Sequence, residues 1–554
     1  MSKLEEALDE ISSLIEDGTI KDKNTLQNEK VRVAKKYELG RIPSNSDIMA
    51  HYGVNLPFLQ RKPMRTMSGV AVIAVMTRPA PCPHGKCTYC PGGPEQDVPQ
   101  SYTGHEPAAM RAIQNNFHPF LQVYRRIEQL QAVGHPTDKI ELIVMGGTFP
   151  SQDLDYQEYF VRECLSAMNF YNKEISSDAI FSCLFPSDDK DVPKEAADLL
   201  ARRPLLLEDA QEANETSGNR CIGITFETRP DWAMRPHIDR MLSYGGTRVE
   251  LGVQTVYDFI YSKVKRGHTT ADVKESTALL KDQAFKINYH MMPGLPGSNP
   301  ERDIRTFERI FDDPAYRPDM IKFYTCLVLE NTELYDDYLA GTYTPYTTEE
   351  TVELLVKAKS LMPEWVRTMR IQRDIPTTKI AAGVMKSNMG QMVEEEMKRR
   401  GLRCRCIRCR EIGQRCYKDG IDPQEDDVKL IRRTYEASGG TEEFLSYEDT
   451  RNDALIGFIR LRSPGDHVFR KEITSSSGLI RELHVYGPMV PIGKSDGAWW
   501  QHKGYGNKLL KESERIAIEE YDMDKMIIIS GIGVRGYYRK HGYERDGPYM
   551  SKAL

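Results

Sequence analysis

Six apolar runs that alternate with long amphipathic segments constrain the fold of this chain more than any other feature. The runs cover residues 68–79, 139–147, 221–228, 247–255, 285–294 and 320–330. Segments with helical periodicity, such as residues 107–134 and 271–284, separate them. Alternation of this kind, with runs apolar enough to be buried on both faces, indicates a parallel β-sheet and favours a full or partial (β/α) barrel. Functional side chains in such barrels lie at the carboxyl ends of the strands, where this chain has glycine-rich and polar residues.

The length of 554 residues exceeds what one hydrophobic core usually serves and predicts three or four domains. We place an N-terminal helical and basic region at residues 1–66, the barrel at 67–346, a basic linker with a cysteine cluster at 347–420, and an acyltransferase-sized α/β domain at 421–554. The chain has no run of about eighteen apolar residues, and its N-terminus is acidic and amphipathic rather than a basic stub before an apolar core. We therefore expect a cytoplasmic protein without a membrane partner.

The loop after the first apolar run holds Cys82, Cys87 and Cys90 in the sequence "APCPHGKCTYCPGG". Seven of the eleven cysteines lie in two clusters. In a reducing compartment, clustered cysteines indicate metal binding rather than a disulfide framework. Three thiolates from one loop suit a [4Fe–4S] cluster in which one iron lacks a protein ligand. A zinc ion with a distant fourth cysteine suits the same spacing equally well.

Two basic blocks occur in a chain whose formal net charge is −6. Residues 21–67 carry ten Lys and Arg against four Asp and Glu, and residues 364–418 carry fourteen against six. Such blocks predict a polyanion-binding surface assembled from separate segments. A solvated charged face is an equally good explanation of either block alone.

A second cysteine group lies in the basic linker, where "CRCIRC" supplies Cys404, Cys406 and Cys409. One further thiol would complete a tetrahedral zinc site, which would hold the linker to the barrel and leave no open position for chemistry. Cys326, at the end of the last apolar run, is the preferred fourth ligand, and Cys416 is the alternative. Unligated thiols are the competing explanation.

A short glycine motif marks the C-terminal domain. The sequence "QHKGYGNKLL" (residues 501–510) has the form Q-x-x-G-x-G at the start of a helix and follows the strand "RELHVYG". Glycines allow close approach of the backbone, and N–H groups at a helix N-terminus bind pyrophosphate. A lone motif of this length is weak evidence, but the order of elements around it resembles that of acetyl-CoA-binding N-acetyltransferases.

The cysteine loop, together with "VMGGTFPS" at the end of the second run, resembles the radical S-adenosylmethionine enzymes. The gap between Cys82 and Cys87 is one residue longer than the commonest pattern, and Thr148 stands where many members have Glu. A closer resemblance is carried by "RKPMRTMSGVAVIAVMTRPAPCPHGKCTYCPGG", "QSYTGHEPAAMRAI", "CIGITFETRPD", "ELGVQT" and "RDIP". From about Leu59 to the end, the chain is similar to the catalytic subunit of Elongator, a family that modifies the wobble uridine of tRNA.

The resemblance implies an α/β fold in which a partial (β/α) barrel of the radical S-adenosylmethionine type is joined, through a helical linker, to a GNAT-type acetyltransferase domain. The zinc expected to staple this linker is inferred from its cysteines and not from the resemblance. In the barrel, the loop cysteines would hold a [4Fe–4S] cluster. Gly146, Gly147 and Thr148 would contact the methionine end of S-adenosylmethionine. Three further polar residues lie at strand ends, namely Glu227, Arg229 and Gln254. They either contact the cofactor or substrate or make structural bonds at the rim of the barrel.

In the acetyltransferase domain, the resemblance implies a binding site for acetyl-CoA. The residues expected to bind this cosubstrate are Glu482, Leu483, His484 and Val485 along the pantetheine arm, and Gly504, Tyr505 and Gly506 around the pyrophosphate. Tyr537 or Tyr538 would lie near the thioester, where a phenol could protonate the departing thiolate. Lys139 is expected to reach acetyl-CoA from the barrel side.

The implied reaction forms 5-carboxymethyluridine at position 34 of tRNA. A radical from S-adenosylmethionine would take a hydrogen atom from the acetyl methyl group, the carbon radical would add to C5 of uridine, and hydrolysis would release CoA. The expected partners are the tRNA anticodon loop and either a second copy of the chain or Elongator-like subunits. The candidates for phosphate contacts are Arg367, Arg370, Arg373, Arg403, Arg405 and Arg408. The rival functions are a protein lysine acetyltransferase with a structural iron–sulfur cluster and a tRNA-binding scaffold with vestigial sites.

Overall fold

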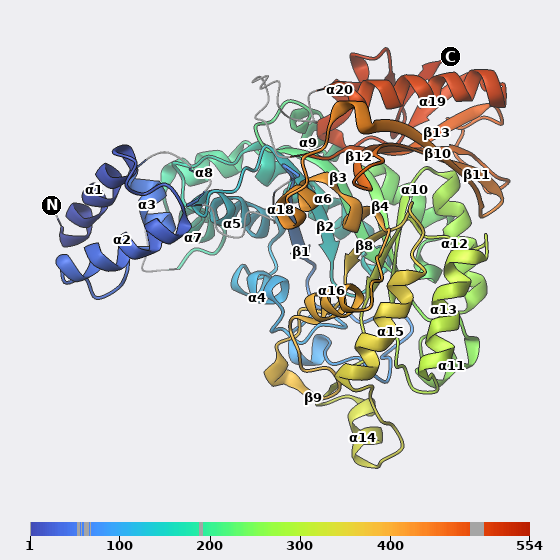
Figure 1. Cartoon of the computed structure of the whole chain (residues 1–554), viewed down its shortest axis with the longest axis horizontal. Coiled ribbons are helices and arrows are strands. Elements are labelled where there is room, and N and C mark those ends of the chain that lie inside the picture. Colours follow the sequence, from blue (N-terminus) through green and yellow to red (C-terminus); the bar gives the residue numbers. More distant parts are fainter. Residues whose placement is uncertain are drawn as a thin grey trace.

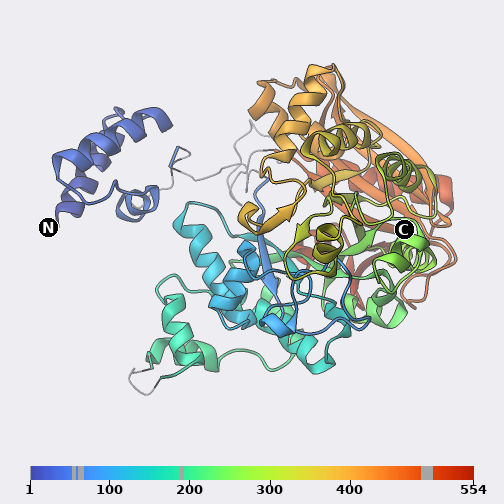
Figure 2. The same cartoon turned by 90° about the horizontal axis from the view of Figure 1, so that it is seen from below.

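The computed structural model describes residues 2–52, 56, 58–59, 66, 68–187, 192–487 and 503–554. Figure 1 shows a group of N-terminal helices, a central sheet wrapped by helices, and a second sheet that lies over one end of the first. The N-terminal helices lie to one side of the body in both Figure 1 and Figure 2. In the described part of the chain, every helix is too short or too polar to cross a membrane.

The central sheet has seven parallel strands in the order β1-β2-β3-β4-β5-β6-β8. Their bounds are Ala71–Met76 (β1), Lys139–Met145 (β2), Arg220–Thr228 (β3), Gly246–Gln254 (β4), Lys286–Met291 (β5), Met320–Phe323 (β6) and Arg367–Arg370 (β8). The sheet curls but does not close, since β1 and β8 are its two edges. The predicted partial (β/α) barrel is therefore confirmed.

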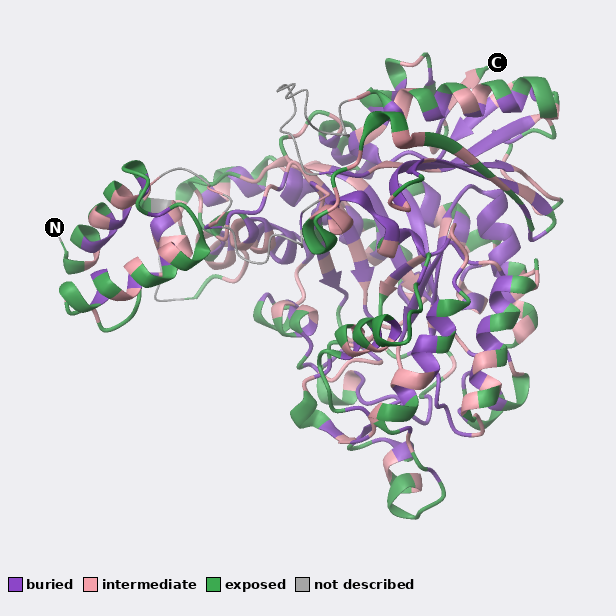
Figure 3. Cartoon of the chain, in the orientation of Figure 1, coloured by how far each residue is buried: buried purple, intermediate pink, exposed green. Residues whose placement is uncertain are grey.

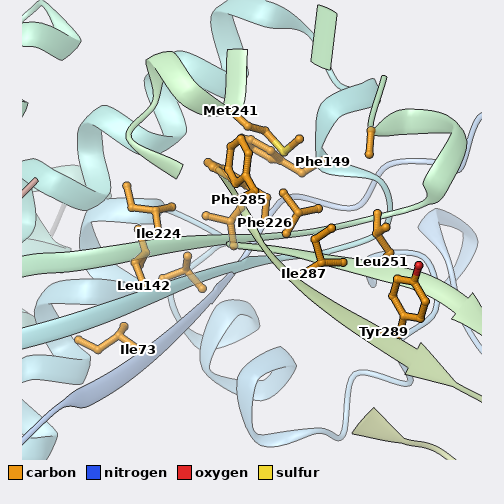
Figure 4. Packing of buried hydrophobic residues seen from close by; sticks show 14 of the residues in the cluster. Ile73, Leu142, Phe149, Ile224, Phe226, Met241, Leu251, Phe285, Ile287 and Tyr289 are labelled. Atoms are coloured by element: carbon orange, nitrogen blue, oxygen red, sulfur yellow. The ribbon is translucent and has the colours of Figure 1, made fainter. Parts of the chain in front are cut away.

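Helices cover the outer face of this half-barrel (Figures 1 and 3). The helices of this part are α4 (Pro107–Gln114), α5 (Pro119–Ala132), α6 (Leu154–Asn169), α7 (Ser177–Leu184), α8 (Lys194–Ala201), α9 (Leu207–Asn214), α10 (Arg235–Ser243), α11 (Asp258–Lys263), α12 (Thr270–Asp282), α13 (Pro300–Asp312), α14 (Glu333–Leu339) and α15 (Thr348–Ser360). Ile73, Leu142 and Ile224 are fully buried in the core of this part (Figure 4). Phe149 stacks on Phe226 there, with ring centroids 5.3 Å apart.

The concave face of the same strands is polar, which corrects the expectation of strands buried in apolar surroundings on both faces. Along β2, Lys139 and Glu141 face a cavity while Ile140 and Leu142 are buried. Side chains alternate between the two faces of a strand, so an apolar outer row alternates with an inner row that is charged in β4 (Arg248 and Glu250) and apolar in β1. An unclosed barrel admits water to its inner face, which allows charged residues to remain there.

The second sheet has seven strands in the order β10-β11-β12-β13-β14-β16-β15. Their bounds are Val428–Ala437 (β10), Gly440–Asp449 (β11), Ala454–Ser463 (β12), Ser477–Val485 (β13), Lys525–Ile528 (β14), Glu544–Asp546 (β15) and Tyr549–Ala553 (β16). Neighbours are antiparallel except β13 and β14, which are parallel. These two strands pair only as far as Ile480 and Ile528, whereas β13 continues to Val485. They therefore separate into a wedge, next to α19 (Tyr505–Tyr521) and α20 (Arg535–Arg539).

The chain between the two sheets corrects one predicted boundary. The strand β8 belongs to the barrel sheet although it lies within residues 347–420, which were assigned to the linker. The expected end of the barrel at residue 346 is therefore wrong. A four-residue strand, "RTMR", has no apolar run that would mark it in the sequence. The remaining elements of this region are β9 (Ile380–Ala382), which pairs with β7 (Val328–Leu329), and α16 (Met389–Arg399), α17 (Ile407–Arg410) and α18 (Ile412–Asp419).

The N-terminal helices have a small core of their own. They are α1 (Lys3–Glu16), α2 (Lys23–Lys36) and α3 (Asn45–Tyr52). Leu8, Ile11 and Val33 are buried between them. This part therefore packs as a module beside the half-barrel, which α3 contacts through α5.

Buried ion pairs join the second sheet to the amino-terminal end of the half-barrel. Arg481 Nη1 lies 2.9 Å from Asp319 Oδ1, just before β6, and Arg462 Nε lies 2.8 Å from Asp282 Oδ1, just before β5. All four side chains are fully buried. Loss of one partner would leave an uncompensated buried charge, which is strongly destabilising. These pairs therefore fix the second sheet over one end of the barrel.

Candidate active site

The predicted iron–sulfur ligands lie in a proline-rich loop that follows β1 at the carboxyl end of the half-barrel. Cys82, Cys87 and Cys90 are all buried. Gln100 Nε2 donates a hydrogen bond to Cys90 Sγ at 3.0 Å, and Arg266 Nη1 donates to Cys87 Sγ at 3.7 Å. Burial raises the pKa of Cys82. N–H donors and a guanidinium directed at sulfur favour thiolate, the form that binds metal.

The spread of these three sulfurs distinguishes between the two metals that the spacing allowed. Zinc binds each thiolate at about 2.3 Å, which places the sulfurs of one site within about 4 Å of one another. Among the described residues, Cys404, Cys406 and Cys409 form a group whose ligand atoms lie within 4.8 Å of one another, whereas the loop cysteines do not. The donor chemistry and the spread of the loop thiols fit a cluster with separate iron corners better than a single ion.

The glycine pair at the end of β2 lies beside the cysteine loop. Gly146 and Gly147 have φ values of 116° and 66°, and a Cβ on Gly146 would stand 2.4 Å from Thr77 Oγ1. Thr148 Oγ1 lies 3.6 Å from Cys82 Sγ. Only glycine can adopt this backbone conformation with a neighbouring atom so close. The glycine pair therefore allows a ligand to lie against the backbone next to Cys82.

A cavity of about 1260 Å³ connects the two predicted sites. Cys82, Gly147 and Thr148 line it at the carboxyl end of the half-barrel, and Lys139 lines it at the other end. The predicted acetyl-CoA residues that also line it are Glu482, Leu483, His484, Val485, Tyr537 and Tyr538. Pockets for one small ligand usually measure about 300–1,000 Å³, so this cavity has room for more than one.

The wedge between β13 and β14 forms the second end of the cavity. Tyr537 OH lies 3.2 Å from the place that a Cβ on Gly506 would take, at the first turn of α19. Gly504 precedes this helix with φ of 77°. Burial raises the pKa of Tyr537 and of Tyr538, so both phenols keep their protons at neutral pH. Gln501, the first residue of the glycine motif, lies outside the described residues.

Comparisons with known proteins agree with this architecture. Residues 4–67 match the ELP3 N-terminal domain, residues 80–310 the Radical SAM superfamily and residues 318–399 the Radical_SAM C-terminal domain. The tRNA uridine(34) acetyltransferase of Methanocaldococcus jannaschii is 50% identical over 561 residues, which covers 100% of this chain and 97% of that protein. Elongator complex protein 3 of Homo sapiens is 43% identical over 542 residues, 96% of this chain and 93% of that protein. The chain belongs to the Elp3 family.

A solved structure of a relative extends the likeness to the fold. The archaeal Methanocaldococcus infernus Elp3 with residues 1–46 deleted superposes with a TM-score of 0.74 at 47% identity, and covers 88% of this chain and 100% of that chain. The predicted resemblance to the catalytic subunit of Elongator is therefore confirmed. The radical SAM match also supports a [4Fe–4S] cluster and S-adenosylmethionine as cofactors.

The inner face of the half-barrel carries a polar cluster that our sequence reasoning only partly identified. Lys322 Nζ contacts Glu250 Oε2 and lies 3.4 Å from Glu227 Oε1. His290 Nε2 lies 2.8 Å from Glu250 Oε2, and Tyr102 OH donates to Glu227 Oε2 at 2.9 Å. Only Glu227 was predicted. The available signal was a charged or polar residue at alternate positions within otherwise apolar strands, as in "VELG" and "MIKF".

The other two predicted rim residues of this Elp3-family chain differ, since Arg229 has an ion-pair partner and Gln254 has a strained backbone conformation. Arg229 pairs with Asp231 at 2.8 Å, as expected for a structural ion pair. Gln254 has a φ of 72°, and its Oε1 has no hydrogen-bond partner among the described residues. A non-glycine residue in the left-handed region costs free energy and is concentrated at functional sites. Gln254 therefore remains a candidate for a ligand contact.

The structure corrects the predicted fourth ligand of the second cysteine group. Cys326 packs with Cys87, Cys90 and Tyr343 at the carboxyl end of the half-barrel. Cys416 packs beneath the second sheet. Neither belongs to the group of Cys404, Cys406 and Cys409. The choice of Cys326 is therefore wrong, because the end of β6 and the linker cysteines face different parts of the core. The side chain next to this cysteine group is Lys359 of α15, whose Nζ lies 3.6 Å from Cys409 Sγ.

The predicted arginines separate into two sets. Arg367, Arg370, Arg373 and Arg408 line the large cavity, whereas Arg403 and Arg405 line a separate pocket of about 410 Å³. Arg367 is held by Glu411 at 2.9 Å and by Tyr486.

Proposed function

We propose that this Elp3-family chain converts uridine 34 of tRNA into 5-carboxymethyluridine and takes the added carbons from acetyl-CoA. The cavity shared by the cysteine loop and the β13–β14 wedge carries the proposal. The relatives named tRNA uridine(34) acetyltransferase support it. A protein lysine acetyltransferase with a structural cluster would not need a passage between the acyl site and the cluster.

The cluster would be held by the loop cysteines, with S-adenosylmethionine beside Gly147 and Thr148; when bound, they supply a carbon radical that can take a hydrogen atom from a methyl group. The chain itself orients the reactants and excludes competing hydrogen donors. The apolar outer core and the second sheet enclose the half-barrel at its sides and its amino-terminal end. The acetyl methyl group could therefore meet the uridine within the half-barrel.

The second sheet would act as a GNAT-type acetyltransferase domain that binds acetyl-CoA. Beyond Ile480, β13 no longer pairs with β14, and its backbone on that side would follow the pantetheine arm, while the N-terminus of α19 would bind the pyrophosphate. Tyr537, which is 36% exposed, is better placed than Tyr538, at 6%, to donate a proton to the departing thiolate. Lys139 would approach the acyl group from the barrel side.

The tRNA anticodon loop would enter at the rim that carries the cysteine loop. Arg370, Arg373 and Arg408 line the cavity and would contact phosphates there. A human relative is named as a protein of the Elongator complex. A second copy of this chain or partner subunits of that kind, and a cytoplasmic location, are part of the proposal.

The linker would be stapled by zinc. Cys404, Cys406 and Cys409 offer three close sulfurs, and zinc sites that serve only structure have four protein ligands. The Lys359 ammonium donates to Cys409 Sγ at this place, so it balances the charge of the thiolates and is not itself a zinc ligand.

Passage of the acyl group through the half-barrel is the step to test. Ile143 lines the cavity on β2 between the two sites, so Ile143→Trp should obstruct it. We expect wobble carboxymethylation to fall by at least about tenfold, measured by nucleoside mass spectrometry after anaerobic incubation with methyl-labelled acetyl-CoA. Iron content and acetyl-CoA affinity should stay at the wild-type level. A variant with normal product formation would contradict the proposed route, and absence of label from uridine 34 with the wild-type chain would refute the function.

A further inference from the structure

Three side chains on the wall of the cavity form a row of hydrogen-bonding groups with a defined order. The Glu227 carboxylate accepts a hydrogen bond from Tyr102 OH on one oxygen, at 2.9 Å, and faces Lys322 Nζ on the other, at 3.4 Å. All three residues line the cavity. When a ligand donates to Glu227 in place of Tyr102, the single hydroxyl proton of Tyr102 can turn to the ligand, and the row then presents a donor, an acceptor and a donor.

The surrounding residues hold this row in place. Lys322 also contacts Glu250, whose carboxylate is fully buried and is bonded by Asn288 Nδ2 at 3.0 Å and His290 Nε2 at 2.8 Å. Burial alone would lower the pKa of Lys322, but its ion pair with Glu250 outweighs that effect and raises the pKa. The lysine therefore remains an ammonium donor at neutral pH.

Tyr102 is fixed by the tight packing of the cysteine loop. A Cβ on Gly92 would stand 2.0 Å from the Tyr102 carbonyl oxygen, so the two segments touch through their backbones. Burial raises the pKa of Tyr102 well above its usual value, which keeps the phenol protonated. The carboxylates and the imidazole of this cluster lie close enough for a metal ion, but Lys322 already supplies the positive charge between the two carboxylates.

Uracil presents the complementary order on its Watson–Crick edge: the O4 acceptor, the N3–H donor and the O2 acceptor. Cytosine presents a donor at N4 and an acceptor at N3, so it opposes the row at both positions. We propose that Lys322, Glu227 and Tyr102 form the subsite that reads the uracil edge of the flipped wobble base, an inference that rests on the proposed function. Enzymes that act on flipped or splayed bases generally read this edge by hydrogen bonds.

The positions of the two donors also set the orientation of the base. Tyr102 belongs to the loop at the rim, whereas Lys322 lies on β6 within the half-barrel. With O2 at Tyr102 and O4 at Lys322, the ribose faces the rim through which tRNA enters. The C4–C5 side of the ring then faces inward, toward the end of the cavity that Lys139 and Tyr537 line. C5 is the atom that must receive the new carbon.

The test measures binding, separately from the reaction. Fluorescence anisotropy with the iron-reconstituted full chain would compare two anticodon stem-loops that differ only in U34 or C34. We expect the wild-type chain to prefer U34 by about tenfold, since each well-made base contact contributes a factor of this order. Glu227→Gln should reduce the preference to within about twofold, because the amide can accept from N3–H of uracil or donate to N3 of cytosine. Tyr102→Phe should weaken both stem-loops by a similar factor, because both bases present O2.

Glu141→Gln is the matched control. Glu141 lines the same cavity and pairs with Arg248 at 2.5 Å, toward the acyl end. Its removal should leave the U34 preference unchanged. The subsite is overturned if Glu227→Gln keeps the full preference, or if the wild-type chain binds both stem-loops equally while it modifies U34. If the predicted binding ratios are found but no product forms, the subsite stands and the proposed reaction fails.

Discussion

The two cysteine groups of this chain look alike in sequence and differ in every structural respect that bears on function. Cys82, Cys87 and Cys90 lie at the rim of the half-barrel, with their sulfurs too far apart for one ion, and Cys82 lines the large cavity. The linker cysteines gather within 4.8 Å of one another against the outer core, and none of them lines that cavity. A cofactor on the first group can meet a substrate, whereas a metal on the second can only hold segments together.

The side chains around the sulfurs sharpen this contrast. Gln100 and Arg266 direct N–H groups at Cys90 and Cys87, and Cys82 lines the cavity. In the linker, Thr368 Oγ1 donates to Cys406 Sγ at 3.4 Å and Lys359 closes the remaining side. Surroundings, rather than the spacing of cysteines, therefore separate a reactive centre from a structural one.

The largest effect is expected from Cys87→Ser. Loss of one of three thiolates should prevent assembly of the cluster, because the two thiolates that remain in the loop are too few to hold it. We expect iron and sulfide per chain to fall to background and wobble modification to disappear. Zinc content should be unchanged. Cys183→Ser, at a lone thiol remote from both groups, is the control and should keep iron and product.

Cys406→Ser should have the reverse profile. We expect zinc to be lost while iron per chain remains at the wild-type level, and the midpoint of thermal unfolding to fall by roughly 5 °C, because a closed metal site contributes directly to folding stability. Metal analysis and thermal unfolding measure the two effects. Loss of iron together with zinc would show that the two groups are not independent and would break the comparison.

The sequence was sufficient to find the first group because its three thiols lie in one short loop. The cysteines follow one strand, and Gly146, Gly147 and Thr148 follow its neighbour, so the carboxyl ends of two parallel strands bring them together. The half-barrel itself followed from the apolar runs. Strand β8 was not predicted, because a four-residue strand without an apolar run is identified only by its pairing with the neighbouring strand.

The second group could not be completed from sequence because its fourth neighbour comes from another element. Lys359 stands 45 residues before Cys404 in α15, and a lysine in an amphipathic helix is ordinarily a surface residue. Cys326 was predicted because it is a cysteine at the end of the last apolar run, and neither property places it beside the linker. The row of Tyr102, Glu227 and Lys322 could not be recognised in the sequence either, because Tyr102 and Lys322 meet Glu227 only when the sheet curls.

A moderate effect is expected from Arg266→Gln. The guanidinium donates to Cys87 Sγ and to the Gly252 carbonyl at 2.8 Å, and it places a positive charge beside a cluster ligand. Its removal should make the reduction potential of the cluster more negative and slow product formation by about tenfold, since hydrogen bonds and charge near the sulfurs tune that potential. A redox titration followed by electron paramagnetic resonance would measure the shift. Arg266→Lys, which keeps the charge, should recover part of it; an unchanged potential in Arg266→Gln would mean that the contact is only structural.

The smallest effect on wobble modification is expected from Lys359→Met, which tests whether this lysine supports the linker cysteines. Burial would lower the pKa of Lys359, but the neighbouring thiols outweigh it and raise the pKa, so the side chain is matched to negative charge on sulfur. Methionine keeps the length and the apolar stem and removes the nitrogen. We expect zinc affinity, measured by competition with a chelator, to fall by about 10–100-fold, as for other groups that support metal ligands. Iron content and wobble modification should stay at wild-type levels, because the linker cysteines do not line the cavity. Zinc affinity equal to wild type would show that the lysine does not support the thiolates. A loss of modification would show that the linker group affects the chemistry.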